Sequence, residues 1–305
     1  MKTRIRWFSF AILIAVSGLV RGAEAPLTFG VFPYVSRSQL MDLHTPLKLY
    51  LEQQLQRPVE MITAPDFAEF MARTQQGEYD LILTAPHLGR LAETRDGYIR
   101  VAKTWHQVSG VFLARKDSGI RSLAHLKGKT IMMAQPISIV YQMGVEELRQ
   151  NGLIPGKDVT VIGSRTHNNA LYAPARRESD ASVTGIVLWD KAEPDIRAQL
   201  LEIGKTPGVP GFMVMANRRL SADLIKRIQT AVFAFDKTIE GKTYFDATEF
   251  KHFEKIDNKS MRQLEPYTRV LTHSATLASA LGRLSGKVPP ACAMSGRPPP
   301  LPPHC

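Results

Sequence analysis

The sequence predicts an α/β fold of two lobes, each built around a largely parallel sheet. The main observation is a repeated unit in which an apolar strand, a short polar loop and a helix follow one another. In its clearest copy, a strand at 59–62 precedes a helix that Asp66 caps and Gly77 ends, and a second strand follows at 79–84. Parallel sheets of this kind bind ligands at the carboxyl ends of their strands.

The second observation is an export signal at the N-terminus. Lys2, Arg4 and Arg6 precede an apolar run over residues 7–20, and Ala23 and Ala25 are the small residues that a signal peptidase reads. The run has 14 residues, fewer than the roughly 20 that a membrane-spanning helix needs. We therefore predict a cleaved signal peptide over residues 1–25 and a periplasmic mature protein.

The net charge and its distribution limit the kinds of binding partner that we expect for this protein. The whole chain carries a net charge of +11, and removal of four basic residues and one acidic residue with the signal peptide leaves +8. The remaining Lys and Arg residues are dispersed among Asp and Glu, without the basic runs interleaved with aromatic residues that nucleic-acid binding favours. We expect a monomer with a mild preference for anions and no nucleic-acid partner.

The order of elements divides the mature chain into parts. We expect residues 26–116 together with 205–281 to form the first lobe, and residues 117–204 to form the second. The chain is expected to cross between them at 116–119 and to return through a strand at 211–215. Residues 282–305 form a proline-rich tail that cannot build a core and is expected to be extended and mobile. Its Cys292 and Cys305 could pair as a disulfide in an oxidising compartment.

Two helices have clear boundary signals. Thr45 is expected to cap the first helix, with Pro46 at its first helical position. Ser221 is expected to cap a long helix that Gly241 ends. The apolar residues of that helix recur at spacings of three and four: Ile225, Ile228, Val232, Phe235 and Ile239.

Candidate site residues follow the strands of both lobes. Alternatives remain for several of them: Phe67 could pack in the core, Ser138 could only cap a helix, and His167 could be protonated or neutral. Asp66 is expected to cap a helix together with Glu69. The expected ligand-binding residues are Tyr34, Phe67, Thr84, His87, Ser138, Tyr141, His167 and Thr184.

Five stretches resemble segments of a known family: 29–34 (FGVFPY), 63–67 (TAPDF), 77–87 (GEYDLILTAPH), 123–130 and 167–171 (HNNAL). Over residues 27–239 the chain resembles the substrate-binding proteins of ABC importers in the phosphate, phosphite and phosphonate group. The resemblance implies a type II periplasmic-binding-protein fold, in which two lobes joined by a two-strand hinge close on a small ligand. In the hydroxyl-rich turn that meets the ligand anion, this chain retains only Ser138. Asn168 takes the place of an acidic residue and joins the expected site.

The expected function is a receptor that delivers a small anionic or polar solute, such as a phosphonate, phosphite or phosphate, to the membrane permease of an ABC importer. An alternative is a periplasmic sensory partner of a membrane signalling receptor. An enzyme is not expected, because the sequence has no GxSxG elbow, no Walker A loop and no GxGxxG. His87, His106 and His167 lack the spacing of a known metal motif, so neither a metal nor a cofactor is expected.

Overall fold

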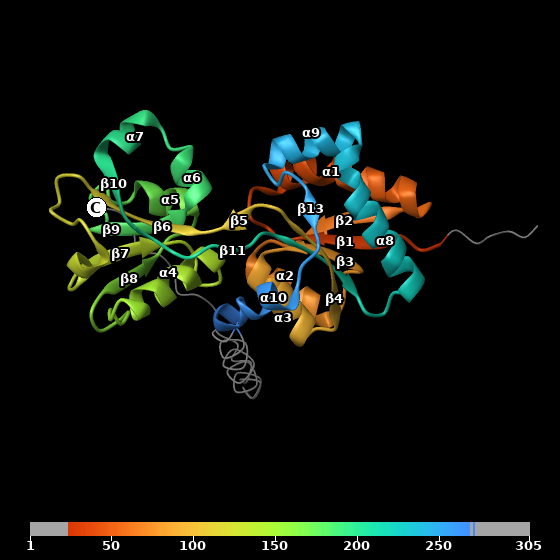
Figure 1. The fold of residues 1–305 in the computed structure, drawn as a ribbon, viewed down its shortest axis with the longest axis horizontal. Coiled ribbons are helices and arrows are strands. Elements are labelled where there is room, and N and C mark those ends of the chain that lie inside the picture. Colours follow the sequence, from red (N-terminus) through yellow and green to blue (C-terminus); the bar gives the residue numbers. More distant parts are fainter. Residues whose placement is uncertain (1–23, 269–270, 272–305) are drawn as a thin grey trace, which may run out of the picture.

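The computed structural model describes residues 24–268 and 271, which form two lobes side by side (Figure 1). The predicted signal peptide, apart from its last two residues, and the proline-rich tail with Cys292 and Cys305 lie outside the described residues. Within the described range, no helix is long and apolar enough to cross a membrane.

The first lobe contains a six-stranded sheet in the order β13-β4-β12-β3-β1-β2. Its strands are β1 (Leu27–Val31), β2 (Val59–Thr63), β3 (Leu81–Thr84), β4 (Tyr98–Thr104), β12 (Met213–Asn217) and β13 (Phe253–Glu254). β1 pairs in parallel with β2 and β3, whereas β12 is antiparallel to β3 and β4. The sheet is therefore mixed rather than wholly parallel.

Helices cover both faces of this sheet. One face carries α1 (Arg37–Leu55), α8 (Ala222–Ala234) and α9 (Ile239–Thr248), and the other carries α2 (Phe67–Gln76) and α3 (Pro86–Thr94). All four residues of β3 are buried, because helices lie against the strand on both sides. This explains why β3 reads as a continuous apolar run rather than as an alternating pattern.

The second lobe contains a five-stranded sheet in the order β10-β6-β9-β7-β8. Its strands are β6 (Gly110–Arg115), β7 (Thr130–Met133), β8 (Thr160–Gly163), β9 (Ala181–Gly185) and β10 (Leu200–Lys205). α4 (Ile139–Gln150) packs on one face, and α5 (His167–Tyr172), α6 (Ile186–Asp190) and α7 (Pro194–Gln199) pack on the other. β7 is parallel to β8 and β9, as the repeated unit predicts.

Two short antiparallel strands join the lobes. β5 (Gln107–Val108) pairs with β11 (Val209–Pro210) in the middle of the molecule (Figure 1), which confirms the two-strand hinge. The expected crossing point at residues 116–119 is wrong. β6 precedes that loop and already pairs with β9 and β10, so the chain crosses before Gly110. The apolar residues of β6 are buried in the second sheet, and burial of that run decides the lobe to which the strand belongs.

Gly211 lies where the return crossing enters the first lobe. A Cβ atom there would lie 2.3 Å from Oγ1 of Thr104 and 2.4 Å from the carbonyl oxygen of His106. We expect Gly211→Ala to lower the free energy of unfolding by about 1–3 kcal/mol. The added methyl group would force the backbone at Thr104 and His106, where the chain leaves the first lobe, to move. Urea unfolding measures this loss. Gly163→Ala is the matched control, since its Cβ would meet only Pro136 at 3.9 Å; equal losses in both variants would contradict the expectation.

The first helix begins earlier than the sequence indicated. Ser36 rather than Thr45 is the N-cap, and its hydroxyl accepts the N–H of Gln39 at 3.4 Å. Pro46 therefore lies inside α1. The hydroxyl of Thr45 donates to the carbonyl of Met41 at 2.6 Å, a bond that a residue within a helix can make.

The long helix predicted from Ser221 to Gly241 is two helices. Ser221 caps α8 as expected, but α8 ends at Ala234 and a 3₁₀ turn follows. Thr238 then caps α9 by accepting the N–H of Gly241 at 2.9 Å. Ile239 is 81% exposed, so its agreement with the apolar spacing was coincidental. The capping hydroxyl of Thr238 offers a local alternative to continuing the helix.

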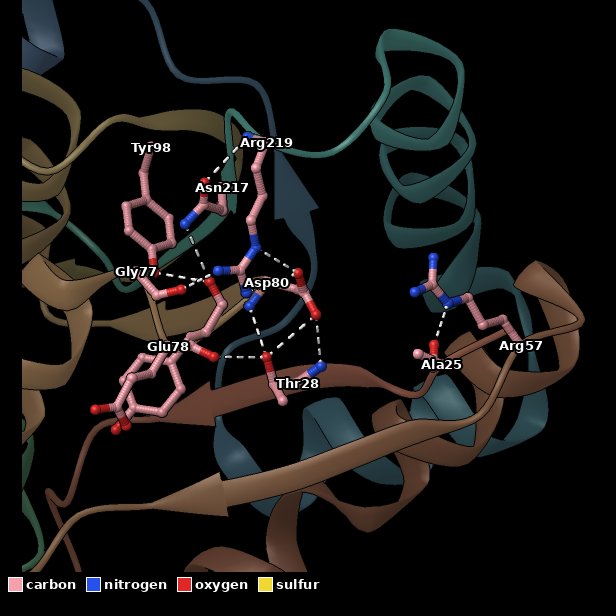
Figure 2. A network of polar contacts seen from close by, with 10 residues as sticks. Ala25, Thr28, Arg57, Gly77, Glu78, Asp80, Tyr98, Asn217 and Arg219 are labelled. Carbon is pink, nitrogen blue, oxygen red and sulfur yellow. Dashed lines mark hydrogen bonds and ion pairs between the residues drawn. The ribbon is translucent and has the colours of Figure 1, made fainter. Parts of the chain in front are cut away.

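One side-chain interaction is repeated in both lobes, at the edge of each sheet away from the carboxyl ends of its parallel strands. Asp80, just before β3, accepts the backbone N–H of Thr28 at 2.9 Å (Figure 2). The N–H of Asp80 donates in turn to the carbonyl of Thr28. Asp180, just before β9, does the same for Thr130, with an N–H to carboxylate distance of 2.9 Å. Arg219 adds a further bond to Asp80 at 3.0 Å. These aspartates fix β1 against β3 in the first lobe and β7 against β9 in the second.

Candidate functional site between the two lobes

The carboxyl ends of the parallel strands in the two lobes meet at one contact. His87 lies in the first turn of α3, and its Nε2 is 2.8 Å from the carbonyl oxygen of Ile137, which lies just before α4 in the second lobe. A carbonyl can only accept, so Nε2 carries the hydrogen. His87, predicted from the first lobe, therefore bonds to the residue that precedes Ser138, predicted from the second lobe.

His87 is buried and uncharged. Its side chain is 1% exposed, and burial lowers its pKa to about 4, although the bond to Ile137 acts in the opposite direction. Because Nε2 holds the hydrogen, Nδ1 of the neutral ring is a hydrogen-bond acceptor. Nδ1 has no partner among the residues that the structure describes.

Three residues predicted from the second lobe form one cluster. The Oγ of Ser138 lies 3.1 Å from Nε2 of His167, and the hydroxyl of Thr184 donates to the carbonyl of His167 at 3.2 Å. Burial lowers the pKa of His167 to about 4, so its ring is neutral at pH 7. Its buried Nδ1 lacks a partner within the described part of the chain.

The hydroxyl of Ser138 bonds to His167 rather than to the backbone of α4. Ser138 occupies the N-cap position of α4, yet its hydroxyl makes no capping bond to the described backbone. The N-terminus of a helix presents unpaired N–H groups and a partial positive charge, which favour an anion. Tyr141 lies on the first turn of α4 and packs against the core, and burial raises its pKa. Asn168, on the first turn of α5, is exposed.

The first lobe contributes an aromatic wall. The ring of Tyr34 stacks on Phe32 at 4.9 Å, and Phe32 contacts Phe67 at 5.9 Å and Phe212 at 4.7 Å between ring centroids. Tyr34, Phe32 and Phe67 follow parallel strands, and Phe212 precedes the antiparallel β12, so all four lie at the same edge of the sheet. Sequence reasoning missed Phe212, whose only signal was its position after the Pro210-Gly211 pair.

A buried histidine holds Tyr34 in place. His44 of α1 is fully buried, with Nε2 2.9 Å from the hydroxyl of Tyr34 and Nδ1 3.1 Å from the hydroxyl of Tyr244 in α9. Burial lowers the pKa of His44 to about 4, so one ring nitrogen donates and the other accepts. Sequence reasoning missed this contact because Tyr34 and Tyr244 are far apart in the chain.

Thr84 and Asp66 lie apart from this cluster. Thr84 is fully buried and lines a cavity of about 10 Å³ with Phe70 and Leu88, on the α2 and α3 face of the sheet. Its hydroxyl has no partner within residues 24–268. Asp66 caps α2 as predicted, accepting the N–H of Glu69 at 2.8 Å.

The lobes touch at further points around the cluster. Lys191, after α6, pairs with Glu249, after α9. α10 (Asn258–Arg262) packs against β11 (Figure 1). The structure thus has the two lobes in contact, with the polar cluster at their interface.

The chemistry available at this interface is hydrogen bonding by neutral groups. The hydroxyl of Ser138 and the rings of His87 and His167 can each donate or accept without carrying a charge. Among the described residues, no group of three or more His, Cys, Asp or Glu side chains could hold a metal ion. The arrangement suits a small polar solute held next to an aromatic wall.

Comparison with known proteins gives one family and one fold. A family model described as "ABC transporter, phosphonate, periplasmic substrate-binding protein" matches residues 29–261. No curated protein sequence matches the chain.

Three solved structures illustrate the shared fold. XAC2383 from Xanthomonas citri, bound to chloride, has a TM-score of 0.71 at 19% identity over 81% of this chain and 99% of its own. PhnD1 from Prochlorococcus marinus, in complex with methylphosphonate, has a TM-score of 0.70 at 19% identity, covering 81% and 98%. The aliphatic sulphonate-binding protein SsuA from Escherichia coli has a TM-score of 0.61 at 14% identity, covering 83% and 94%.

Proposed function

Because the chain belongs to the family of periplasmic substrate-binding proteins of ABC phosphonate transporters, we propose that it holds a small oxyanion of the phosphonate type between its lobes. The protein is a solute-binding receptor, and its family implies a membrane permease as the partner. Its export through the predicted signal peptide, its monomeric state, and the absence of catalysis and of nucleic-acid binding are part of the proposal.

One observation carries the choice of site. Nδ1 of His87 and Nδ1 of His167 are buried without partners in the described residues, and the hydroxyl of Ser138 bonds to Nε2 of His167 and makes no capping bond. Buried polar atoms without a partner cost about 1–3 kcal/mol each. A small polar ligand would supply these partners, so this interface is where binding gains most.

Hinge closure explains how the site forms. Ser138, His167 and Thr184 come from one lobe, whereas Tyr34, Phe67 and His87 come from the other. Rotation about β5 and β11 would separate the two groups and admit the ligand. Closure would then bring the neutral donors of the second lobe and the N-terminus of α4 to the aromatic wall of the first. Asn168 and Tyr141 would lie at the margin of this site.

Two structural relatives name different oxyanions, methylphosphonate and aliphatic sulphonates. For this chain the family description favours the phosphonate. The same description favours import over the sensory alternative.

Thermal-shift measurements followed by calorimetry test the proposal. The mature protein is screened with methylphosphonate, phosphite, phosphate and methanesulfonate. A ligand present at 100 times its Kd should stabilise the protein by about 2.7 kcal/mol. If none of these anions raises the melting temperature, the proposed ligand class is wrong.

His167→Ala tests the site within the second lobe. The variant removes the ring beside Ser138, and we expect it to weaken methylphosphonate binding by about tenfold or more, because a ligand group loses its partner in a desolvated site. Calorimetry measures the change in Kd. The control is His125→Ala, which removes an exposed imidazole from the same lobe. Unchanged affinity in His167→Ala would place the site elsewhere.

A further inference from the structure

The direction of one hydrogen bond determines what His87 offers to a ligand. Its Nε2 faces a backbone carbonyl, which has no hydrogen to give, so Nε2–H is the donor. The neutral ring has only one N–H, and Nδ1 is therefore a lone-pair acceptor. Burial lowers the pKa of His87 to about 4, so the second ring nitrogen remains unprotonated at pH 7.

This acceptor lies at the lobe interface. The opposite side of the same five-membered ring touches the carbonyl of Ile137, the residue before Ser138. The side chain is 1% exposed, and within the described residues no donor reaches Nδ1. The lone pair of Nδ1 would repel a ligand oxygen that carries no hydrogen. It would be satisfied by a ligand that brings its own hydrogen.

Phosphonates and sulfonates differ in this respect. A singly charged phosphonate keeps one P–O–H group, whereas a sulfonate of the same shape and charge has three bare oxygens. We infer that Nδ1 of His87 accepts the hydrogen of a monoprotonated phosphonate and thereby makes the site discriminate against sulfonates. The inference rests on the proposed function. It adds the protonation state of the bound ligand and names His87 as the residue that distinguishes this state.

The bond to Ile137 makes this discrimination depend on lobe closure. That bond orients the imidazole and fixes which nitrogen is bare, so the acceptor is defined only while the two lobes are in contact. His87 has two separable roles: Nε2 joins the lobes, and Nδ1 meets the ligand.

Two variants separate these roles. In Gln the amide nitrogen can take the position of Nε2, so His87→Gln keeps a donor for Ile137 but lacks an acceptor at the position of Nδ1. In Asn the amide oxygen can take the position of Nδ1, so His87→Asn keeps the acceptor and loses the contact between the lobes. Comparing them distinguishes ligand recognition from a merely structural contribution.

The experiment measures Kd for methylphosphonate and methanesulfonate by calorimetry at pH 6, where the phosphonate has a substantial singly protonated fraction. For the parent protein we expect methylphosphonate to bind about tenfold or more tightly, because a sulfonate leaves Nδ1 without a partner. In His87→Gln the ratio of the two Kd values should fall towards one. In His87→Asn both affinities should weaken, and the ratio should fall less than in His87→Gln, because the Asn side-chain oxygen remains available as an acceptor.

Three outcomes of the calorimetry would contradict the inference or the proposed function. Equal affinity of the parent for both anions would overturn the inference and leave the proposed oxyanion receptor standing. If His87→Gln still prefers methylphosphonate to methanesulfonate, the inference is also overturned, because another residue must then accept the ligand hydrogen. If neither anion binds the parent, the proposed ligand class fails and the inference fails with it.

Discussion

Lowering the pH from 7 to 5 is expected to destabilise the protein by about 4 kcal/mol through His44 and His87 alone. Both side chains are almost fully buried, at 0% and 1% exposed. Burial lowers both pKa values from 6.5 to about 4. At pH 5 the unfolded chain has protonated both rings and the folded chain neither, and each 1.5-unit interval corresponds to about 2 kcal/mol.

The sign follows from proton counting. Between pH 4 and pH 6.5 the unfolded state binds more protons, so stability rises with pH in that window. The contribution is fully present above about pH 6.5 and is lost as the pH falls through the folded-state value near 4. His106 and His167, whose pKa values are also lowered to about 4, act in the same direction.

Urea unfolding at several pH values between 5 and 6 measures this slope. Each buried histidine should contribute close to one proton, or about 1.4 kcal/mol per pH unit. His44→Gln should therefore show a shallower slope by nearly one proton, whatever its stability at pH 7. A stability that does not vary over this range would show that the rings are protonated in the folded protein.

Replacing Asp80 by Ala is expected to cost about 3 kcal/mol of unfolding free energy. The carboxylate is 12% exposed and accepts from Arg219 and from the N–H and hydroxyl of Thr28 (Figure 2). Its removal leaves the N–H of Thr28 and one charged group without their partner. We place the loss at the low end for a broken buried pair, because Arg219 is 48% exposed and solvent can reach it.

Asp180→Ala is the matched comparison, because Asp180 accepts the corresponding N–H of Thr130 in the second lobe, and no arginine in the described part of the chain bonds to it. We expect it to cost about half as much. Chemical unfolding of both variants gives the two losses. A larger loss in Asp180→Ala would mean that Arg219 adds nothing to the contact in the first lobe.

Much of the architecture could be predicted because local rules and tertiary packing agree there. Asp66 and Gly77 bound α2 as expected, and the apolar runs became β1, β2, β3, β7 and β9. Boundaries failed where two local signals competed. Pro46 suits the start of a helix, but the helix begins at Ser36 and passes through it. Thr238 starts a new helix within a stretch whose apolar spacing had predicted one continuous helix.

The positions of strand ends indicated only some of the contacts at the candidate site. Strand ends indicated Ser138, His167 and Thr184, which hydrogen bonds connect, and His87, which bonds to the residue before Ser138. The carboxyl ends of parallel strands share one end of a sheet, which is why this could be expected. They could not show that Thr84 is fully buried beneath α2 and α3, in a small cavity with Phe70 and Leu88. They also could not find His44, which reaches Tyr34 from within a helix and Tyr244 across 200 positions of sequence.

The sequence by itself determined the two-lobed α/β class, the family and the strand ends that carry the polar groups, because periodicity, capping and short motifs are local properties. The tertiary structure alone decided that the chain crosses before Gly110, that His87 bonds to Ile137, and which of its ring nitrogens is left bare. A hydrogen bond between lobes depends on how two separate sheets are placed in space, and sequence periodicity carries no information about that placement.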